Sequence, residues 1–285
     1  MSVETARAPG VRAPLGRNGD SAGAGDGTRE VPVIALEGVS KHFRDRAGRE
    51  VHALGPVDLT IRTGEFVSLV GPSGCGKSTL LRLIAGLEPA SAGTLNRYGN
   101  PLSSPSHEVG IIFQEHVLFP WASVLENVLL PADILSLPRE SAQARAWQLL
   151  EMTGLKDFAH HRPQNLSGGM KQRAAFCRAM LADPRFLLLD EPFGALDALT
   201  REELSLELSR LWGALGRTAF MITHDIDEAI LLGDRVLVMS PRPGRIEADI
   251  EVDLPRPRSI DTQSLPRFLE IKNQVRHLIF GHRKG

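Results

Sequence analysis

The sequence has little of several features that mark common protein classes. It contains two cysteines, Cys75 and Cys177, too few and too differently placed for a disulfide framework, which favours a reducing compartment. No apolar run approaches the roughly 18 to 20 residues that a membrane span needs, and the N-terminus lacks the apolar core of a secretory signal. The formal net charge of -1 gives no global basic field for nucleic acid or anionic lipid. We therefore expect a cytosolic globular protein, without a nucleic-acid partner, that another chain would have to hold at any membrane.

What the sequence does contain is a glycine-rich stretch between an apolar run, residues 66–70, and a helical-looking run, residues 80–86. The stretch fits the pattern G-x-x-x-x-G-K-[ST] and consists of Gly71, Pro72, Ser73, Gly74, Cys75, Gly76, Lys77, Ser78 and Thr79. Glycines let the backbone curl round phosphates, and the N–H groups and dipole at the start of the next helix favour an anion. The stretch predicts a phosphate-binding loop (P-loop); the alternative is a glycine turn that only joins strand to helix.

Two side chains of this loop carry the expected chemistry. Lys77 would place a positive charge on the β- and γ-phosphates of a nucleotide, and the Ser78 hydroxyl would ligate Mg²⁺. The sequence lacks the Asn-Lys-x-Asp motif that reads guanine, which argues against a GTPase. ATP with Mg²⁺ is the predicted ligand.

The remaining chain divides by composition and periodicity. Residues 1–30 are rich in Gly, Ala, Arg and Pro with hardly a large apolar side chain, and we predict a disordered tail. Strands are predicted near residues 33–36, 57–61, 66–70, 93–98 and 109–113. Phe43 is an aromatic residue in a polar segment between the first two of these strands. It could stack on a nucleotide base or simply pack.

Residues from about 115 to 183 change to helical spacing, which predicts an inserted helical subdomain whose helices Pro131 and Pro138 interrupt. The loop cluster Phe119-Pro120-Trp121 is either core or a surface that receives a partner. The main domain would span residues 31–252. Residues 253–285 form a C-terminal extension with an amphipathic helix, 266–280, predicted to pack on the domain.

A second candidate anion site begins at Ser167, Gly168 and Gly169. Ser167 is a suitable N-cap for the helix that follows, and two glycines at a helix start expose N–H groups as the P-loop does. A plain capped helix explains Ser167 but not the paired glycines, because glycine weakens a helix by about 1 kcal/mol per residue.

Polar residues follow several predicted strands. The apolar run 186–189 is followed by Asp190 and Glu191, whose side chains would point oppositely in a strand and so perform different tasks. Asp190 suits Mg²⁺, and Glu191 suits orienting or deprotonating the attacking water. Gln114 and His224 also follow apolar strands. The carboxyl ends of parallel strands are where open α/β sheets place their ligands.

With the P-loop, Gln114, the 166–173 motif, Asp190-Glu191, Asp197 and His224 in this order, the chain resembles the ATP-binding cassette subunit of an ABC transporter. The resemblance covers about residues 33–252. It implies an α/β fold, namely a P-loop NTPase cassette with a RecA-like core, an antiparallel β subdomain and an inserted α-helical subdomain. It also implies that Ser167, Gly168 and Gly169 contact the γ-phosphate of ATP held by a second cassette in a head-to-tail homodimer, with Asp197 in the loop that crosses the interface.

The same resemblance assigns the other site residues. It implies that Phe43 stacks on adenine, that Gln114 contacts Mg²⁺ and the attacking water, that Glu191 is the catalytic base and that His224 contacts the γ-phosphate. The segment 114–121 and the helices after it would receive a coupling helix of a transmembrane permease. The expected protein is an ATPase, peripheral at the cytoplasmic face of the inner membrane.

Finer motifs resemble one group of importers. These are Phe119-Pro120-Trp121 and the segments 191–197, 240–246 and 254–258, which resemble importers of nitrate, aliphatic sulfonates or taurine that work with an extracytoplasmic solute-binding protein. Met170 stands where many signatures have Gln, and Phe43 where many have Tyr, but neither change removes a catalytic group. Alternatives are an importer cassette for another small solute such as a pyrimidine precursor, a non-transport cassette acting on nucleic acid, and a binding-only cassette, against which Glu191 and His224 argue.

Overall fold

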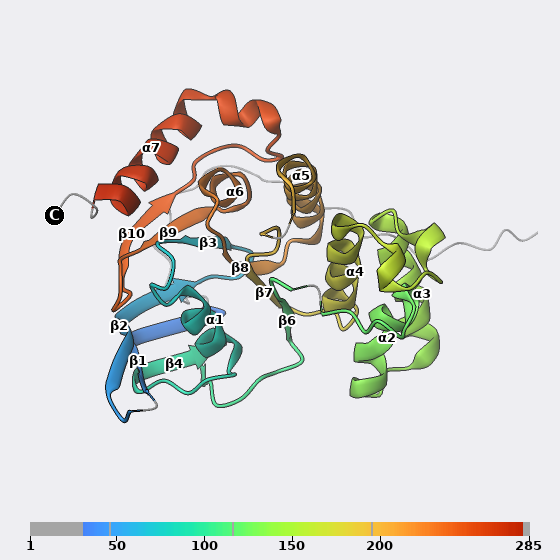
Figure 1. The fold of residues 1–285 in the computed structure, drawn as a ribbon, viewed down its shortest axis with the longest axis horizontal. Coiled ribbons are helices and arrows are strands. Elements are labelled where there is room, and N and C mark those ends of the chain that lie inside the picture. The colour runs from blue at the N-terminus through green and yellow to red at the C-terminus, as the bar shows by residue number, and fades with distance from the viewer. Residues whose placement is uncertain (1–30, 46, 116, 195, 282–285) are drawn as a thin grey trace, which may run out of the picture. The chain divides into compact units, whose positions relative to one another are not determined.

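The computed structural model describes residues 31–45, 47–115, 117–194 and 196–281. The tail predicted for residues 1–30 lies outside them. Two sheets organise the described part of the chain (Figure 1). The first is antiparallel, in the order β2-β1-β4-β5, with β1 (Ile34–Arg44), β2 (Glu50–Ile61), β4 (Ala92–Arg97) and β5 (Asn100–Pro101).

The second sheet carries the core. Its order is β10-β9-β3-β8-β7-β6, with β3 (Phe66–Val70), β6 (Val109–Ile112), β7 (Phe186–Asp190), β8 (Thr218–Ile222), β9 (Arg235–Met239) and β10 (Ile246–Glu251). All its pairs are parallel except β10 with β9. Every residue of β3 and β8 is buried, as expected for parallel strands covered on both faces. The carboxyl ends of β6, β7 and β8 consequently lie side by side.

Seven α-helices are described: α1 (Lys77–Ala85), α2 (Val124–Leu135), α3 (Arg139–Met152), α4 (Gly168–Met180), α5 (Ala198–Leu215), α6 (Ile226–Leu232) and α7 (Pro266–Gly281). The buried face of α1 shares one core cluster with strands of both sheets. Helices α2, α3 and α4 pack on one another and form the green-to-yellow group beside β6 in Figure 1. Among the residues described, no helix combines the length and hydropathy that crossing a bilayer requires.

Two local predictions were wrong. Pro131 does not interrupt a helix but lies within α2, because the buried face of α2 packs against α4 and outweighs one lost backbone hydrogen bond. Pro138 does separate the helices, as the N-cap residue of α3. Phe43 lies in β1 rather than between strands, because β1 continues to Arg44 through irregular pairing with β2.

The C-terminal extension packs on the domain, as predicted. Phe268, Ile271 and Val275 of α7 share a buried cluster with residues of α6, β9 and β10. Before α7, the guanidinium of buried Arg258 donates hydrogen bonds to the carbonyls of Ile230 and Gly233 at the end of α6. It also donates to the carbonyls of residues 252 and 254. Because helix ends leave carbonyls without intrahelical partners, Arg258 serves as a C-terminal cap for α6.

Candidate functional site

The P-loop joins β3 to α1, as the sequence predicts. Gly76 is the N-cap of α1 in a left-handed conformation, with φ 113°, and supplies no side-chain acceptor. The first turn of α1 contains no acidic residue. Its N–H groups and the positive end of the helix dipole are therefore left for an anionic ligand.

Lys77 is held inside this loop. Its side chain is largely buried, and its Nζ donates hydrogen bonds to the carbonyls of Gly71 at 2.9 Å and Pro72 at 3.1 Å. A pocket of about 440 Å³ lies over the loop, and its lining comprises Gly71, Ser73, Gly74, Gly76, Lys77, Ser78, Thr79, Glu191, His224 and Arg242. The structure thus brings most of the P-loop together with the predicted base and the predicted histidine.

Gln114, Glu191 and His224 converge at the ends of β6, β7 and β8. Glu191 Oε2 lies 3.2 Å from Gln114 Nε2 and 3.2 Å from His224 Nδ1. The strand ends at Asp190, and Glu191 takes a left-handed conformation with φ 46° while its N–H donates to the Ile222 carbonyl. The different directions of the two carboxylates therefore come from this backbone turn, not from strand alternation as predicted.

Asp190 and Ser78 form the candidate cation site. Ser78 Oγ lies 3.4 Å from Asp190 Oδ1. Burial raises the pKa of Asp190, the neighbouring Glu191 carboxylate raises it further, and the hydrogen bond from Ser78 opposes the shift. A carboxylate whose charged form is disfavoured in this way fits a position beside a divalent cation, and hydroxyl and carboxylate oxygens are donors that Mg²⁺ accepts.

Glu228 is a buried residue that the sequence did not indicate, and its carboxyl group holds the segment around His224 through Thr223. The Thr223 hydroxyl accepts a hydrogen bond from the Asp225 N–H and donates one to Glu228 Oε2. Burial raises the pKa of Glu228 to about 8, and the hydrogen bond from Thr223 opposes the shift. The available signal was an acidic residue followed directly by the apolar run 229–232.

Residues Ser167 to Gly169 lie elsewhere. Ser167 is the N-cap of α4, and its Oγ accepts a hydrogen bond from the Met170 N–H at 3.3 Å. A Cβ on Gly168 would lie 3.1 Å from Leu196 Cδ2, and one on Gly169 would lie 3.0 Å from Thr200 Cγ2. The absence of side chains at Gly168 and Gly169 thus leaves room for Leu196 and Thr200 near the start of α5. This packing explains the two glycines within this chain. None of the three residues lines the P-loop pocket.

Asp197 and Phe43 also lie outside the pocket lining. Asp197 is the N-cap of α5, and its hydrogen bonds with Thr200 lower its pKa. Phe43 is 39% exposed, and the Lys41 ammonium lies 4.9 Å from the ring centroid. Each residue therefore has a local partner within this chain, Thr200 for Asp197 and Lys41 for Phe43.

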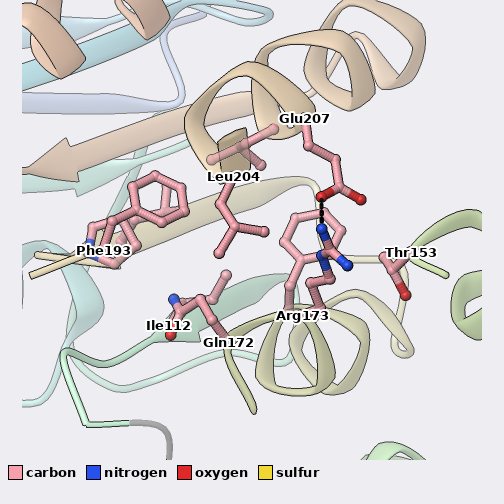
Figure 2. A pocket seen from close by; sticks show the side chains of 11 residues that line it. Ile112, Thr153, Gln172, Arg173, Phe193, Leu204 and Glu207 are labelled. Carbon is pink, nitrogen blue, oxygen red and sulfur yellow. Dashed lines mark ion pairs between the residues drawn. The ribbon is translucent and has the colours of Figure 1, made fainter. Parts of the chain in front are cut away.

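A small cavity of about 30 Å³ lies between α4 and α5. Figure 2 shows Gln172 and Arg173 from α4 facing Leu204 and Glu207 from α5, with Ile112 beside Gln172 and Phe193 at the left. Arg173 Nη2 lies 2.9 Å from Glu207 Oε2, an ion pair that ties the two helices. The helix that Ser167 begins is therefore connected to the helix that Asp197 begins.

A larger apolar hollow of about 470 Å³ lies between β6 and the helices α2 and α4. Its lining includes Phe113, Ile134 and Leu135, all exposed. In the loop before α2, the rings of Phe119 and Trp121 stack with centroids 5.0 Å apart, and Trp121 is 70% exposed. Of the two interpretations of this cluster, the exposed ring favours a partner surface.

Comparison with known proteins gives consistent matches. A family model described as "ABC transporter" matches residues 54–194. The taurine import ATP-binding protein TauB of Rhizobium johnstonii is 43% identical over 252 residues, covering 87% of this chain and 96% of the relative. The aliphatic sulfonates import ATP-binding protein SsuB of Bacillus cereus is 45% identical over 243 residues, covering 85% and 94%.

Two further similarities concern a longer protein and a solved structure. The bicarbonate transport ATP-binding protein CmpC of Synechococcus elongatus is 44% identical over 246 residues, which are 85% of this chain, and the chain spans 37% of that relative. A dimeric structure of the ATP-binding cassette MJ0796 in a post-hydrolysis state, bound to ADP and Pi, aligns with a TM-score of 0.67 and 33% identity. The alignment covers 78% of this chain and 99% of that chain.

Proposed function

This chain belongs to the ABC transporter ATP-binding proteins, and on that premise we propose that it hydrolyses ATP to energise an importer of a small solute. The observation that carries the proposal is the contact of Gln114, Glu191 and His224 at three neighbouring strand ends, with Glu191 and His224 lining the P-loop pocket. A phosphate cradle, a base and two polar groups placed together are the parts that phosphoryl transfer to water requires.

The division of labour follows from the contacts. The P-loop N–H groups and Lys77 hold the β- and γ-phosphates, and Glu191 accepts the proton of the attacking water. Gln114 and His224 fix the Glu191 carboxylate through its Oε2 atom. Ser78 and Asp190 would hold Mg²⁺, with Gln114 as a further donor, and the bound ion would neutralise phosphate charge.

The second half of the site comes from a second copy of this chain. Ser167 and Gly168 are exposed, and together with Gly169 they lie outside their own chain's pocket, which supports a contact with ATP held by a partner cassette. Asp197 and the helix it begins would lie at the same interface. The dimeric MJ0796 structure supports this arrangement by similarity.

The coupling partner is a transmembrane permease that the cassette binds at the cytoplasmic face of the inner membrane. The apolar hollow beside β6 and the exposed Trp121 support this docking surface, because a hollow of exposed apolar side chains fits a helix from another chain. The relatives' names support a small solute with an oxyanion group, such as taurine, an aliphatic sulfonate or bicarbonate. Nitrate is a further candidate from the motif resemblance, and an extracytoplasmic solute-binding protein would deliver the solute.

A phosphate-release assay on the purified chain tests the ATPase. We expect turnover that requires ATP and Mg²⁺ and rises with protein concentration as dimers form. The solute is then identified with the co-purified permease in vesicles, by measuring which candidate solute, together with its binding protein, stimulates ATP turnover. Absence of phosphate release under both conditions would refute the proposal.

A further inference from the structure

The turn between β9 and β10 lies directly against the P-loop. Gly244 pairs with Leu54, and its close approach leaves no room for a side chain, since a Cβ there would lie 2.1 Å from the Cys75 carbonyl oxygen. The Gly244 N–H donates to the Ala53 carbonyl at 3.2 Å, and its own carbonyl accepts from the Gly55 N–H at 3.0 Å. Backbone contacts therefore fix this turn beside the phosphate pocket.

Arg242 projects from this turn onto the loop. Its Nε donates a hydrogen bond to the Gly74 carbonyl at 3.2 Å, and its side chain lines the pocket together with Lys77, Ser78 and His224. The charge of Arg242 acts inside the loop, where it helps to lower the pKa of the Cys75 thiol against the larger effect of burial. Arg242 is thus a cation at the pocket contributed by a segment remote in sequence.

Arg242 forms no ion pair among the residues that the structure describes. Other arginines near this sheet are paired: Arg235 contacts Asp249, and Arg256 contacts Asp234. Across the part of the chain that the structure describes, Arg242 has no acidic partner, and the hydrogen bond to Gly74 uses only its Nε. Its two terminal nitrogens present the donor pair that suits phosphate oxygens.

We infer that Arg242 is a further nucleotide-binding residue, whose guanidinium contacts the phosphates of ATP while its Nε holds the Gly74 carbonyl. This inference rests on the proposed ATPase function. Lys77 is the other permanently charged cation in the described lining, and it is bound to the carbonyls of the loop itself. Arg242 therefore supplies the second positive charge that a polyphosphate needs in this pocket.

The test compares nucleotide affinities of charge variants in one turn. ATP and AMP affinities are measured by calorimetry for the wild type, Arg242→Ala, Arg242→Gln and Arg242→Lys. Arg245→Ala is the matched control. It removes the same charge from the same turn, but Arg245 does not line the pocket. We expect Arg242→Ala and Arg242→Gln to bind ATP about tenfold more weakly and Arg245→Ala to stay within about twofold of wild type. Arg242→Lys should recover only part of the loss, because lysine keeps the charge but lacks the paired donor nitrogens. AMP affinity should change little in any variant.

The salt dependence gives a readout that a structural role would not move. The slope of ATP affinity against salt concentration should be shallower for Arg242→Ala than for the wild type and should recover in Arg242→Lys. The inference is overturned if Arg242→Ala binds ATP like the wild type, if Arg242→Lys loses as much affinity as Arg242→Ala, or if Arg245→Ala shows the same loss. A wild-type protein that binds no ATP would instead refute the proposed function. Melting curves identify any variant that is unfolded.

Discussion

The start of α1 and the start of α4 are two glycine-containing helix N-termini that differ in what surrounds them. At α1 no side chain caps the helix, Lys77 is buried in the loop, and a pocket of about 440 Å³ lies over the loop. At α4 the Ser167 hydroxyl already accepts one N–H, and Ser167 and Gly168 are exposed outside that pocket. The first site is built within one chain, whereas under the proposed function the donors of the second would meet a nucleotide held by another copy of the chain.

Glu191→Gln should have the largest effect, because it removes the base of the site built within the chain. Turnover should fall by about 100-fold or more, with ATP affinity retained, and the variant should accumulate as an ATP-bound dimer. Phosphate release, ATP binding and size-exclusion chromatography measure the three quantities. Glu203→Gln, exposed on α5, is the matched control and should behave like the wild type. Unchanged turnover in Glu191→Gln would contradict the assigned role.

Ser167→Arg tests the start of α4, where Ser167 is the N-cap residue. A long cationic side chain at this exposed position should prevent the partner's nucleotide from reaching α4, so turnover should fall by about tenfold or more. ATP binding by the monomer should remain, because Ser167 lies outside the pocket of its own chain. Loss of ATP binding would show that the residue acts within its own chain.

Mixing two inactive variants sharpens this result. Lys77→Ala destroys the P-loop half and Ser167→Arg the α4 half, so a mixed dimer contains one site with both wild-type halves. We expect the mixture to regain roughly a quarter of wild-type turnover, since about half the dimers are mixed and half their sites are intact. No recovery, with mixed dimers present by mass, would count against a site shared between chains.

Arg201→Ala should have a smaller effect, because Arg201 joins the segment before α5 to the residue after His224 and does not line the nucleotide pocket. Its Nη2 donates to the Leu196 carbonyl at 3.0 Å, and its Nη1 lies 3.5 Å from Asp225 Oδ2. The variant should reduce kcat by about threefold at unchanged ATP affinity, the scale expected for a partly exposed ion pair. Arg201→Lys should recover part of the loss. Steady-state kinetics check both, and a change in ATP affinity alone would contradict this role.

Glu228→Gln should raise the free energy of unfolding, relative to the wild type, by an amount that is small below about pH 5 and grows at higher pH. Because burial raises the pKa of Glu228 to about 8, the folded protein binds this proton more tightly than the unfolded chain. The stability that this group contributes is therefore full below about pH 4.5 and is lost as the pH rises towards 8, whereas Gln cannot ionise. Relative to the wild type, the variant should gain up to a few kcal/mol across this window, measured by urea unfolding with Glu203→Gln as control. Parallel pH profiles would contradict the prediction.

The sequence predicts those parts of the site that are local in the chain. The P-loop, Glu191 and the capping role of Ser167 depend on residues a few positions apart, so pattern and chemistry suffice to find them. Arg242 depends on Gly74, a neighbour far away in sequence. The raised pKa of Glu228 depends on burial within the fold, which the nearby Thr223 does not reveal. Pro131 was misinterpreted for the same reason, because the packing of α2 on α4 is a tertiary effect that the periodicity of one segment does not contain.

The buried guanidinium of Arg258 has a practical meaning for anyone who shortens this protein. Because it joins the end of α6 to the stretch after β10, deleting the chain beyond Val252 would strip hydrogen bonds from the helix that follows His224. The segment after Val252 thus stabilises α6, the helix next to His224. A shortened protein that keeps every sequence motif would still lose this support for the His224 segment.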